Sequence, residues 1–137
     1  MKSFDLHLNF AGNCEEALRF YETCFGGKII MLQRFGEMDM ASPDEYSDKI
    51  LHAIFEADGL KFMAADAMPD QTIHGGSNIS ININFESEAA QAEVYKKLAE
   101  GGLEQMPLQD AFWGATFGMV QDKYEINWML HYDKNPK

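Results

Sequence analysis

Three polar side chains, Asp5, His7 and Asn9, alternate with apolar residues in the N-terminal segment FDLHLNF. Such alternation is typical of a β-strand with one apolar and one polar face, and it predicts a strand over residues 4–10. Imidazole changes charge near neutral pH, so His7 could act as a general base beside a bound substrate. We therefore take His7 as the candidate catalytic residue and all three side chains as candidate ligand contacts.

A second alternating segment, residues 79–85, carries Ser80 and Asn82 on its polar face. A solvated sheet would carry more lysine, glutamate and threonine than these two rows do. Asparagine, serine and histidine instead favour a partly enclosed surface that hydrogen-bonds to water or to a ligand. Ser80 and Asn82 are therefore further candidate ligand contacts.

The two segments belong to an internal repeat with a constant offset of 79 − 4 = 75 positions. The offset extends through a helix-like stretch to Gly26-Gly27 in the first half and Gly101-Gly102 in the second. Each half continues into three further strand-like runs, which predicts tandem βαβββ modules. The predicted fold class is α+β, in one domain over 1–137, with module 1 at about 1–68 and module 2 at about 77–137.

Capping signals mark the start of both predicted helices. Asn13 with Glu16 three residues later forms a capping-box pattern, and Ser87 stands at the matching place before the second helix. Residues 37–48, between the second and third predicted strands, form a polar loop whose role as a lid the sequence leaves open.

Large aromatic residues gather late in the chain, between residues 105 and 130. They predict a hairpin that closes the core, in which Phe112, Trp113 and Trp128 could also form apolar walls of a ligand site. His131 follows on the last predicted strand, in a phase that could bring it near His7.

Composition excludes several classes of function. The formal net charge is −11, which disfavours binding to nucleic acid and to anionic membranes. No apolar run approaches the length of a membrane span, and the N-terminus lacks the apolar stretch of a signal peptide, so a cytoplasmic protein is expected. Cys14 and Cys24 lie ten positions apart on one predicted helix, about 15 Å, and should be free thiols.

The segments LNFAGNCEEALRFYETCFGG and FWGATFGMVQDKYEINWML, within two βαβββ modules, resemble the vicinal-oxygen-chelate (glyoxalase, bleomycin-resistance and dioxygenase) superfamily. Within it the whole chain is similar to the PhnB-like group, which carries the domain label 3-demethylubiquinone-9 3-methyltransferase. The resemblance implies curved mixed sheets around a cavity, and frequently a homodimer. No glycine-rich loop with an acidic partner downstream is present, so a nucleotide-derived cofactor is not expected.

Enzymes of that superfamily hold a divalent metal with histidine and glutamate side chains on the first and last strands of the modules. At the corresponding positions this chain offers His7 on the first strand, but Ser80 and Asn82 on its repeat, and Trp128 and Met129 on the last strand. His7 is the only plausible ligand at a family position, so no cofactor is expected. A divalent metal stays an alternative, completed across a dimer by His52 or His131.

Three hypotheses on function follow. The first is a small-molecule-binding protein with a polar, asparagine-rich cavity and a degenerate metal site. The second is a lyase or isomerase that uses His7, with or without a metal. The third is a protein that confers resistance by sequestering an antibiotic or toxin. Whether the chain is an enzyme at all stays open, because one scaffold hosts many chemistries.

Overall fold

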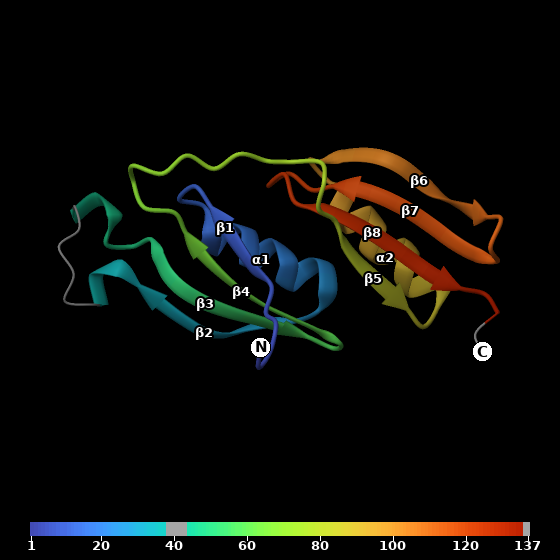
Figure 1. Ribbon diagram of the computed structural model, residues 1–137, viewed down its shortest axis with the longest axis horizontal. Helices are drawn as coiled ribbons and strands as arrows, with labels where there is room; N and C mark the ends of the chain where they lie inside the picture. The colour runs from blue at the N-terminus through green and yellow to red at the C-terminus, as the bar shows by residue number, and fades with distance from the viewer. Residues whose placement is uncertain (38–43, 136–137) are drawn as a thin grey trace. The chain divides into compact units, whose positions relative to one another are not determined.

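The computed structural model describes residues 1–37 and 44–135. The chain forms two compact units, Met1–His74 and Gly75–Lys137. In each unit one helix lies against one face of a four-stranded sheet (Figure 1). No helix within the described ranges is long and apolar enough to cross a membrane.

Unit 1 is a βαβββ module. Its sheet order is β1-β4-β3-β2, with β1 parallel to β4 and the other pairs antiparallel. Short 3-10 turns follow β2 at Phe35–Glu37 and Asp44–Tyr46. In chain order its elements are β1 (His7–Phe10), α1 (Cys14–Phe25), β2 (Lys28–Arg34), β3 (Ile50–Ala57) and β4 (Leu60–Asp66).

Unit 2 repeats this topology, with sheet order β5-β8-β7-β6 and a parallel pair β5-β8. The predicted α+β class with two tandem βαβββ modules and mixed sheets is confirmed. The elements of unit 2 are β5 (Ile81–Phe85), α2 (Glu88–Ala99), β6 (Leu103–Ala111), β7 (Ala115–Gln121) and β8 (Asn127–Asp133).

The core of unit 1 lies between α1 and its sheet. Tyr21 of α1 is fully buried and meets Phe55 and Phe62 edge-on, with ring centroids 6.5 and 5.9 Å apart. Leu8 and Phe10 of β1 are buried on the same side. Because strand side chains alternate between faces, the residues between these point to the opposite face of the sheet. We call the face opposite a unit's own helix its open face.

The core of unit 2 contains Trp128, Leu130 and Val120, all fully buried. Gln91 of α2 is also fully buried, and its Nε2 donates hydrogen bonds to the carbonyl oxygens of Thr116 (2.9 Å) and Leu130 (3.1 Å). These bonds attach α2 to the backbones of β7 and β8. The free cysteines Cys14 and Cys24 are buried in unit 1, as predicted.

The first helix begins differently from the prediction. Asn13 stands at the N-cap, but its side chain makes no capping hydrogen bond, so the capping-box prediction is wrong there. The buried Asp66, at the end of β4, accepts from the backbone N–H of Cys14 at 2.9 Å and from that of Ile50 at 2.8 Å. In unit 2 the predicted cap is confirmed, because Ser87 Oγ accepts from the N–H of Ala90 at 3.1 Å.

The first strand of each module is shorter than the alternation predicts. Phe4 and Ile79 stand outside β1 and β5 and are 84% and 73% exposed, so they do not join the cores. The predicted loop 37–48 lies partly outside the described residues, which resume at Asp44.

Candidate functional site

The open face of unit 1 carries side chains in rows that run across its strands. Side chains opposite one another in neighbouring strands are in contact range, so each row acts as one strip of surface. The central row contains His7, Met63, Ile54 and Met31. The row on one side of it contains Asn9, Ala65, His52 and Gln33. His52 is placed opposite Ala65 by extending the β3-β4 register one residue beyond the pair Ala53 and Ala64. On the other side of the central row lie Lys61, Glu56 and Lys28.

The open face of unit 2 has the same arrangement. Its central row contains Asn82, Met129, Met119 and Met106. The next row contains Asn84, His131, Phe117 and Gln109.

The two faces share residue types at matching places. Methionine fills much of each central row, and five of the nine methionines of the chain lie in these two rows. In each adjacent row asparagine begins the row (Asn9, Asn84) and glutamine ends it (Gln33, Gln109). Each open face therefore combines a flexible apolar band with a band of amides and imidazoles.

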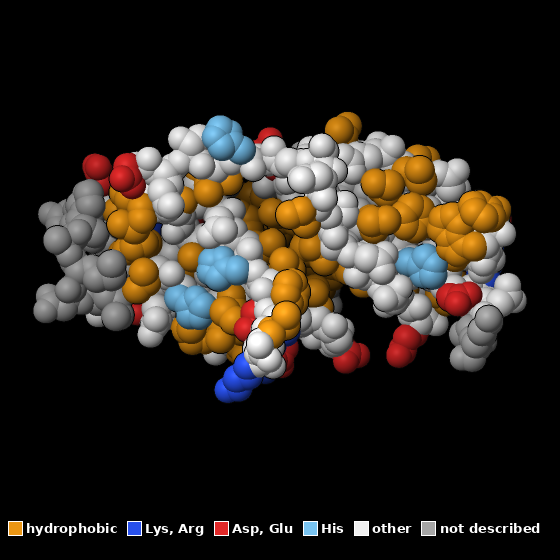
Figure 2. Space-filling view, viewed as in Figure 1, with side chains coloured by type: hydrophobic (Ala, Val, Ile, Leu, Met, Phe, Trp, Pro, Cys, Tyr) orange, Lys and Arg blue, Asp and Glu red, His pale blue; other side chains and the backbone are white. Residues whose placement is uncertain are grey.

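His7 and His52 lie together on the open face of unit 1. Their ring centroids are 6.3 Å apart and their planes are inclined by 22°. Partial burial, and then the neighbouring His52, lower the pKa of His7 below its ordinary value. Two histidine side chains are visible side by side among hydrophobic ones on one face of the molecule (Figure 2).

An aromatic cluster, Trp113, His131 and Phe117 with Phe112 beside it, lies on unit 2. Trp113 Nε1 donates a hydrogen bond to His131 Nε2 at 3.2 Å, and the two rings are within 4° of parallel. Phe117 meets both rings edge-on, at centroid distances of 5.7 and 6.5 Å. The outermost ring, Phe112, stands edge-on to Trp113 and is 97% exposed. This cluster offers aromatic faces and edges beside the amide of Asn84.

The remaining predicted site residues fall in different places. Asn9 and Asn82 lie on the open faces, and Asn82 Nδ2 donates to Asn84 Oδ1 at 3.2 Å. Asp5 and Ser80 are exposed and precede the strands. Trp128 does not lie on the open face: it is fully buried on the helix side, where its indole N–H donates to Asp122 Oδ2 at 2.8 Å. That placement corrects the expectation that Trp128 lines a ligand site.

Sequence reasoning missed the partnership of His7 with His52 and the two methionine rows. His52 precedes the buried Ala53 in β3, so the alternation of side chains already indicated that His52 points to the open face. The methionine rows gave no such signal, because bulges next to Met31 and Met106 break the alternation in β2 and β6.

The residues at the metal positions of the superfamily do not fit a hard divalent ion. Among the described residues, no three histidine, cysteine, aspartate or glutamate side chains gather in one place. Near His7, the open face offers His52, Met63 and Asn9, and near His131 it offers Met129 and Asn84. Thioethers are poor ligands for a hard ion, and neither place supplies a carboxylate to balance its charge.

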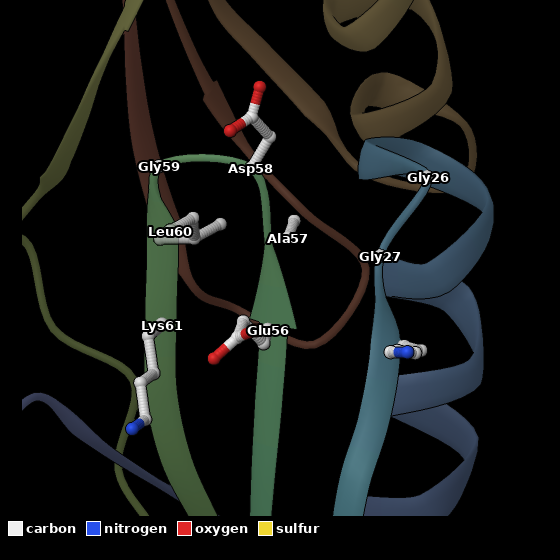
Figure 3. Close-up of a pocket in the computed structure, with 9 residues that line it drawn as sticks. Gly26, Gly27, Glu56, Ala57, Asp58, Gly59, Leu60 and Lys61 are labelled. Carbon is white, nitrogen blue, oxygen red and sulfur yellow. The ribbon is translucent and has the colours of Figure 1, made fainter.

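Two recesses elsewhere on the described surface lack convergent chemistry. One of about 710 Å³ adjoins the turn between β3 and β4 at Asp58-Gly59 (Figure 3). The side chains of Glu56, Asp58 and Lys61 point in different directions there (Figure 3). Another, of about 620 Å³, lies at the start of α1, where the charges pair internally: Arg34 binds Glu15 through both of its terminal nitrogens, at 2.8 and 3.0 Å.

Comparison with known proteins gives the family. Residues 2–131 match the model of the family described as 3-demethylubiquinone-9 3-methyltransferase. Protein YjdN of Escherichia coli K12 is 30% identical over 139 residues, covering 93% of each chain. Protein PA1353 from Pseudomonas aeruginosa is 35% identical, with a TM-score of 0.82 and coverage of 97% of this chain and 100% of that one. The PhnB protein from Bacillus cereus is 29% identical, with the same TM-score and coverage of 96% and 99%.

A more distant structure extends the likeness in fold alone. A glyoxylase/bleomycin resistance protein/dioxygenase domain from Frankia is 13% identical, with a TM-score of 0.69 and coverage of 97% of this chain and 98% of that one. The confirmed βαβββ repeat, the two related open faces and the match along nearly the whole chain agree. The chain belongs to the PhnB-like family described as 3-demethylubiquinone-9 3-methyltransferase, and its fold is that of the glyoxylase/bleomycin resistance protein/dioxygenase domain.

Proposed function

We propose that this protein binds a small organic molecule on the open faces of its sheets, and that binding needs no metal ion. The observation that carries the proposal is the repeated pairing of a methionine band with a band of amides and imidazoles. Methionine side chains adapt to ligands of different shape, while amides and imidazoles orient polar groups.

The aromatic cluster supports the same proposal for unit 2. Trp113 is 51% exposed, yet its indole is held by a hydrogen bond to His131 and by an edge-on contact with Phe117. An exposed aromatic side chain that is already ordered loses little conformational entropy when a ligand stacks on it. We therefore expect planar, partly apolar ligands to contact Trp113.

The two tryptophans of the chain allow a direct test. Trp113 lies in the proposed site, and Trp128 is fully buried away from it, so their indole N–H resonances give one reporter and one internal control. Neutral and charged aromatic fragments, such as benzyl alcohol, benzamide and benzoate, would be titrated into metal-free protein. We expect the Trp113 resonance to move and that of Trp128 to stay. Movement of neither resonance with any fragment would contradict the proposal.

A catalytic role for His7 is the second candidate. It is favoured by the lowered pKa of His7, which keeps the imidazole neutral and able to accept a proton at neutral pH. Elemental analysis of untagged protein purified without chelator would separate the two candidates. A near-stoichiometric metal that is lost in His7→Ala would favour a metal-dependent lyase or isomerase and overturn metal-free binding.

We also propose a homodimer, on the resemblance to the superfamily and on the exposure of large apolar side chains such as Phe112 and Leu103 in unit 2. Sedimentation equilibrium would test it. A single species with the mass of one chain at all concentrations would contradict it.

A further inference from the structure

The two histidines of unit 1 lie on opposite sides of β4, in neighbouring rows of the open face. β1 and β3 both pair with β4, so His7 and His52 reach toward each other across that strand. Between Asn9 and His52 the row is occupied only by the methyl group of Ala65. The small side chain of Ala65 is thus bordered on the open face by two imidazoles and one carboxamide. All three can donate hydrogen bonds there.

Across the described ranges, no acidic side chain forms an ion pair with either imidazole. On the same face, Glu56 stands between Lys61 and Lys28 in the row beyond the central one. Asp5 precedes β1 and is exposed. The β2 residue opposite His52 is Gln33, which carries a neutral amide. Asp66 belongs to the helix side, where both its oxygens accept backbone N–H groups.

We propose that His7, His52 and Asn9 bind the carboxylate of a small amphipathic organic acid, whose apolar part lies on the band of Met63, Ile54 and Met31. The inference rests on the proposed function and adds the ligand class. A carboxylate presents two oxygens, which suits donors from two directions, and it counters the repulsion between two protonated imidazoles. The neighbouring methionine band gives the non-polar part of such an acid a surface that adapts to its shape.

The pH dependence of affinity follows from proton linkage. A bound carboxylate favours the protonated imidazoles, so binding takes up protons and becomes tighter as the pH falls through the range in which histidine titrates. A neutral ligand of the same shape gains nothing from this uptake. The protein as a whole carries a net charge of −11, so a general attraction for anions does not explain tighter binding of an acid.

The experiment compares benzoate with benzamide, its neutral isostere, at about pH 5.5 and about pH 8. Affinity is measured by NMR titration, with the imidazole resonances of His7 and His52 as reporters. We expect benzoate to bind at least about fivefold more tightly at the lower pH, and benzamide equally at both. His52→Gln should reduce the difference for benzoate, because one of the two imidazoles that take up a proton is removed. His74→Gln, in the exposed segment outside the site, should retain it.

Each other outcome overturns the inference. Carboxylate recognition is contradicted if benzoate binds no more tightly than benzamide at about pH 5.5. It is also contradicted if the affinity for benzoate does not change with pH. If both fragments shift the open-face methionines equally, the proposed function stands and only the ligand class fails. If neither fragment shifts them, both fail. His7→Gln is the second variant should His52→Gln not fold, and it too should reduce the pH effect. A pH effect that is unchanged in the variant that folds overturns the inference.

Discussion

Trp113 and His131 are joined by a hydrogen bond of 3.2 Å between Nε1 of the indole and Nε2 of the imidazole, with their rings within 4° of parallel. Indole nitrogen only donates, so His131 accepts and its Nε2 carries no proton. The bond links the turn between β6 and β7 to β8. An aromatic side chain that would otherwise move freely in solvent is thereby held at the open face.

Replacing His131 by phenylalanine should release this arrangement. The His131→Phe variant keeps an aromatic ring at this position but removes the acceptor, so the Trp113 indole N–H should exchange faster with water and its resonance should shift. Affinity for aromatic fragments should fall about two- to tenfold, as expected for loss of one ordering contact. Tyr132→Phe, at the next position of β8, is the matched control. Unchanged fragment affinity in His131→Phe would contradict the role of the cluster.

Asp66→Ala should destabilise unit 1 strongly. It leaves the backbone N–H groups of Cys14 and Ile50 without their acceptor in a buried place, at about 1–3 kcal/mol each. Denaturant unfolding would measure the loss of free energy of unfolding. Asp70→Ala, at an exposed position, should stay within about 0.5 kcal/mol of the original protein. Equal stability of the two variants would show that Asp66 does not hold α1 to β3.

Gln91→Leu should also destabilise the protein, although it makes the core more apolar. The variant loses two donors, so the carbonyl oxygens of Thr116 and Leu130 lose a partner; the penalty should be about 1–3 kcal/mol. The penalty is moderated because Gln91 Oε1 has no hydrogen-bond partner among the described residues, so its removal breaks no bond there. Thermal unfolding of Gln91→Leu and of Gln105→Leu, an exposed control, would measure the difference. A stabilised Gln91→Leu would contradict this account of how α2 is attached.

The lowered pKa of His7 predicts how stability depends on pH. The folded protein binds a proton at His7 less readily than the unfolded chain, in which histidine titrates near about 6.5. The contribution of neutral His7 to stability is therefore full above that pH, and it is lost as the pH falls through the lowered pKa of the folded state. Melting temperatures between about pH 8 and pH 5 should fall less steeply for His7→Gln than for the original protein. Parallel curves would contradict the assignment.

The fold could be predicted from the sequence because both modules repeat strand phase and helix length at one offset. The buried Leu8 and Phe10 follow that phase, as do the exposed Asn82 and Asn84. Strand ends were less predictable, because alternation continues through Phe4 and Ile79 after pairing has stopped. The cap of α1 could not be found locally, since its acceptor, Asp66, comes from 52 positions away.

The candidate site was predictable only in part, for a similar reason. His7 and Asn9 show their face by simple alternation, but a row contains residues from four strands, and its membership depends on register. Bulges in β2 and β6 shift that register, so simple alternation does not predict that Met31 and Met106 lie on the open faces. The prediction for Trp128 was wrong because its size fits both a ligand wall and a core; its full burial on the helix side, with the bond to Asp122, places it in the core.

The central claim, that ligands bind the open faces, is tested most directly with methionines carrying ¹³C-labelled methyl groups. Met31, Met63, Met106, Met119 and Met129 lie on the open faces, while Met1 and Met68 are exposed elsewhere and serve as controls. Each resonance would be assigned by a methionine-to-leucine variant and followed as aromatic fragments are added to metal-free protein. We predict that shifts concentrate on the five open-face methyl groups and that Met1 and Met68 stay unchanged. Shifts spread evenly over all of them, or confined to Met1 and Met68, would contradict the claim.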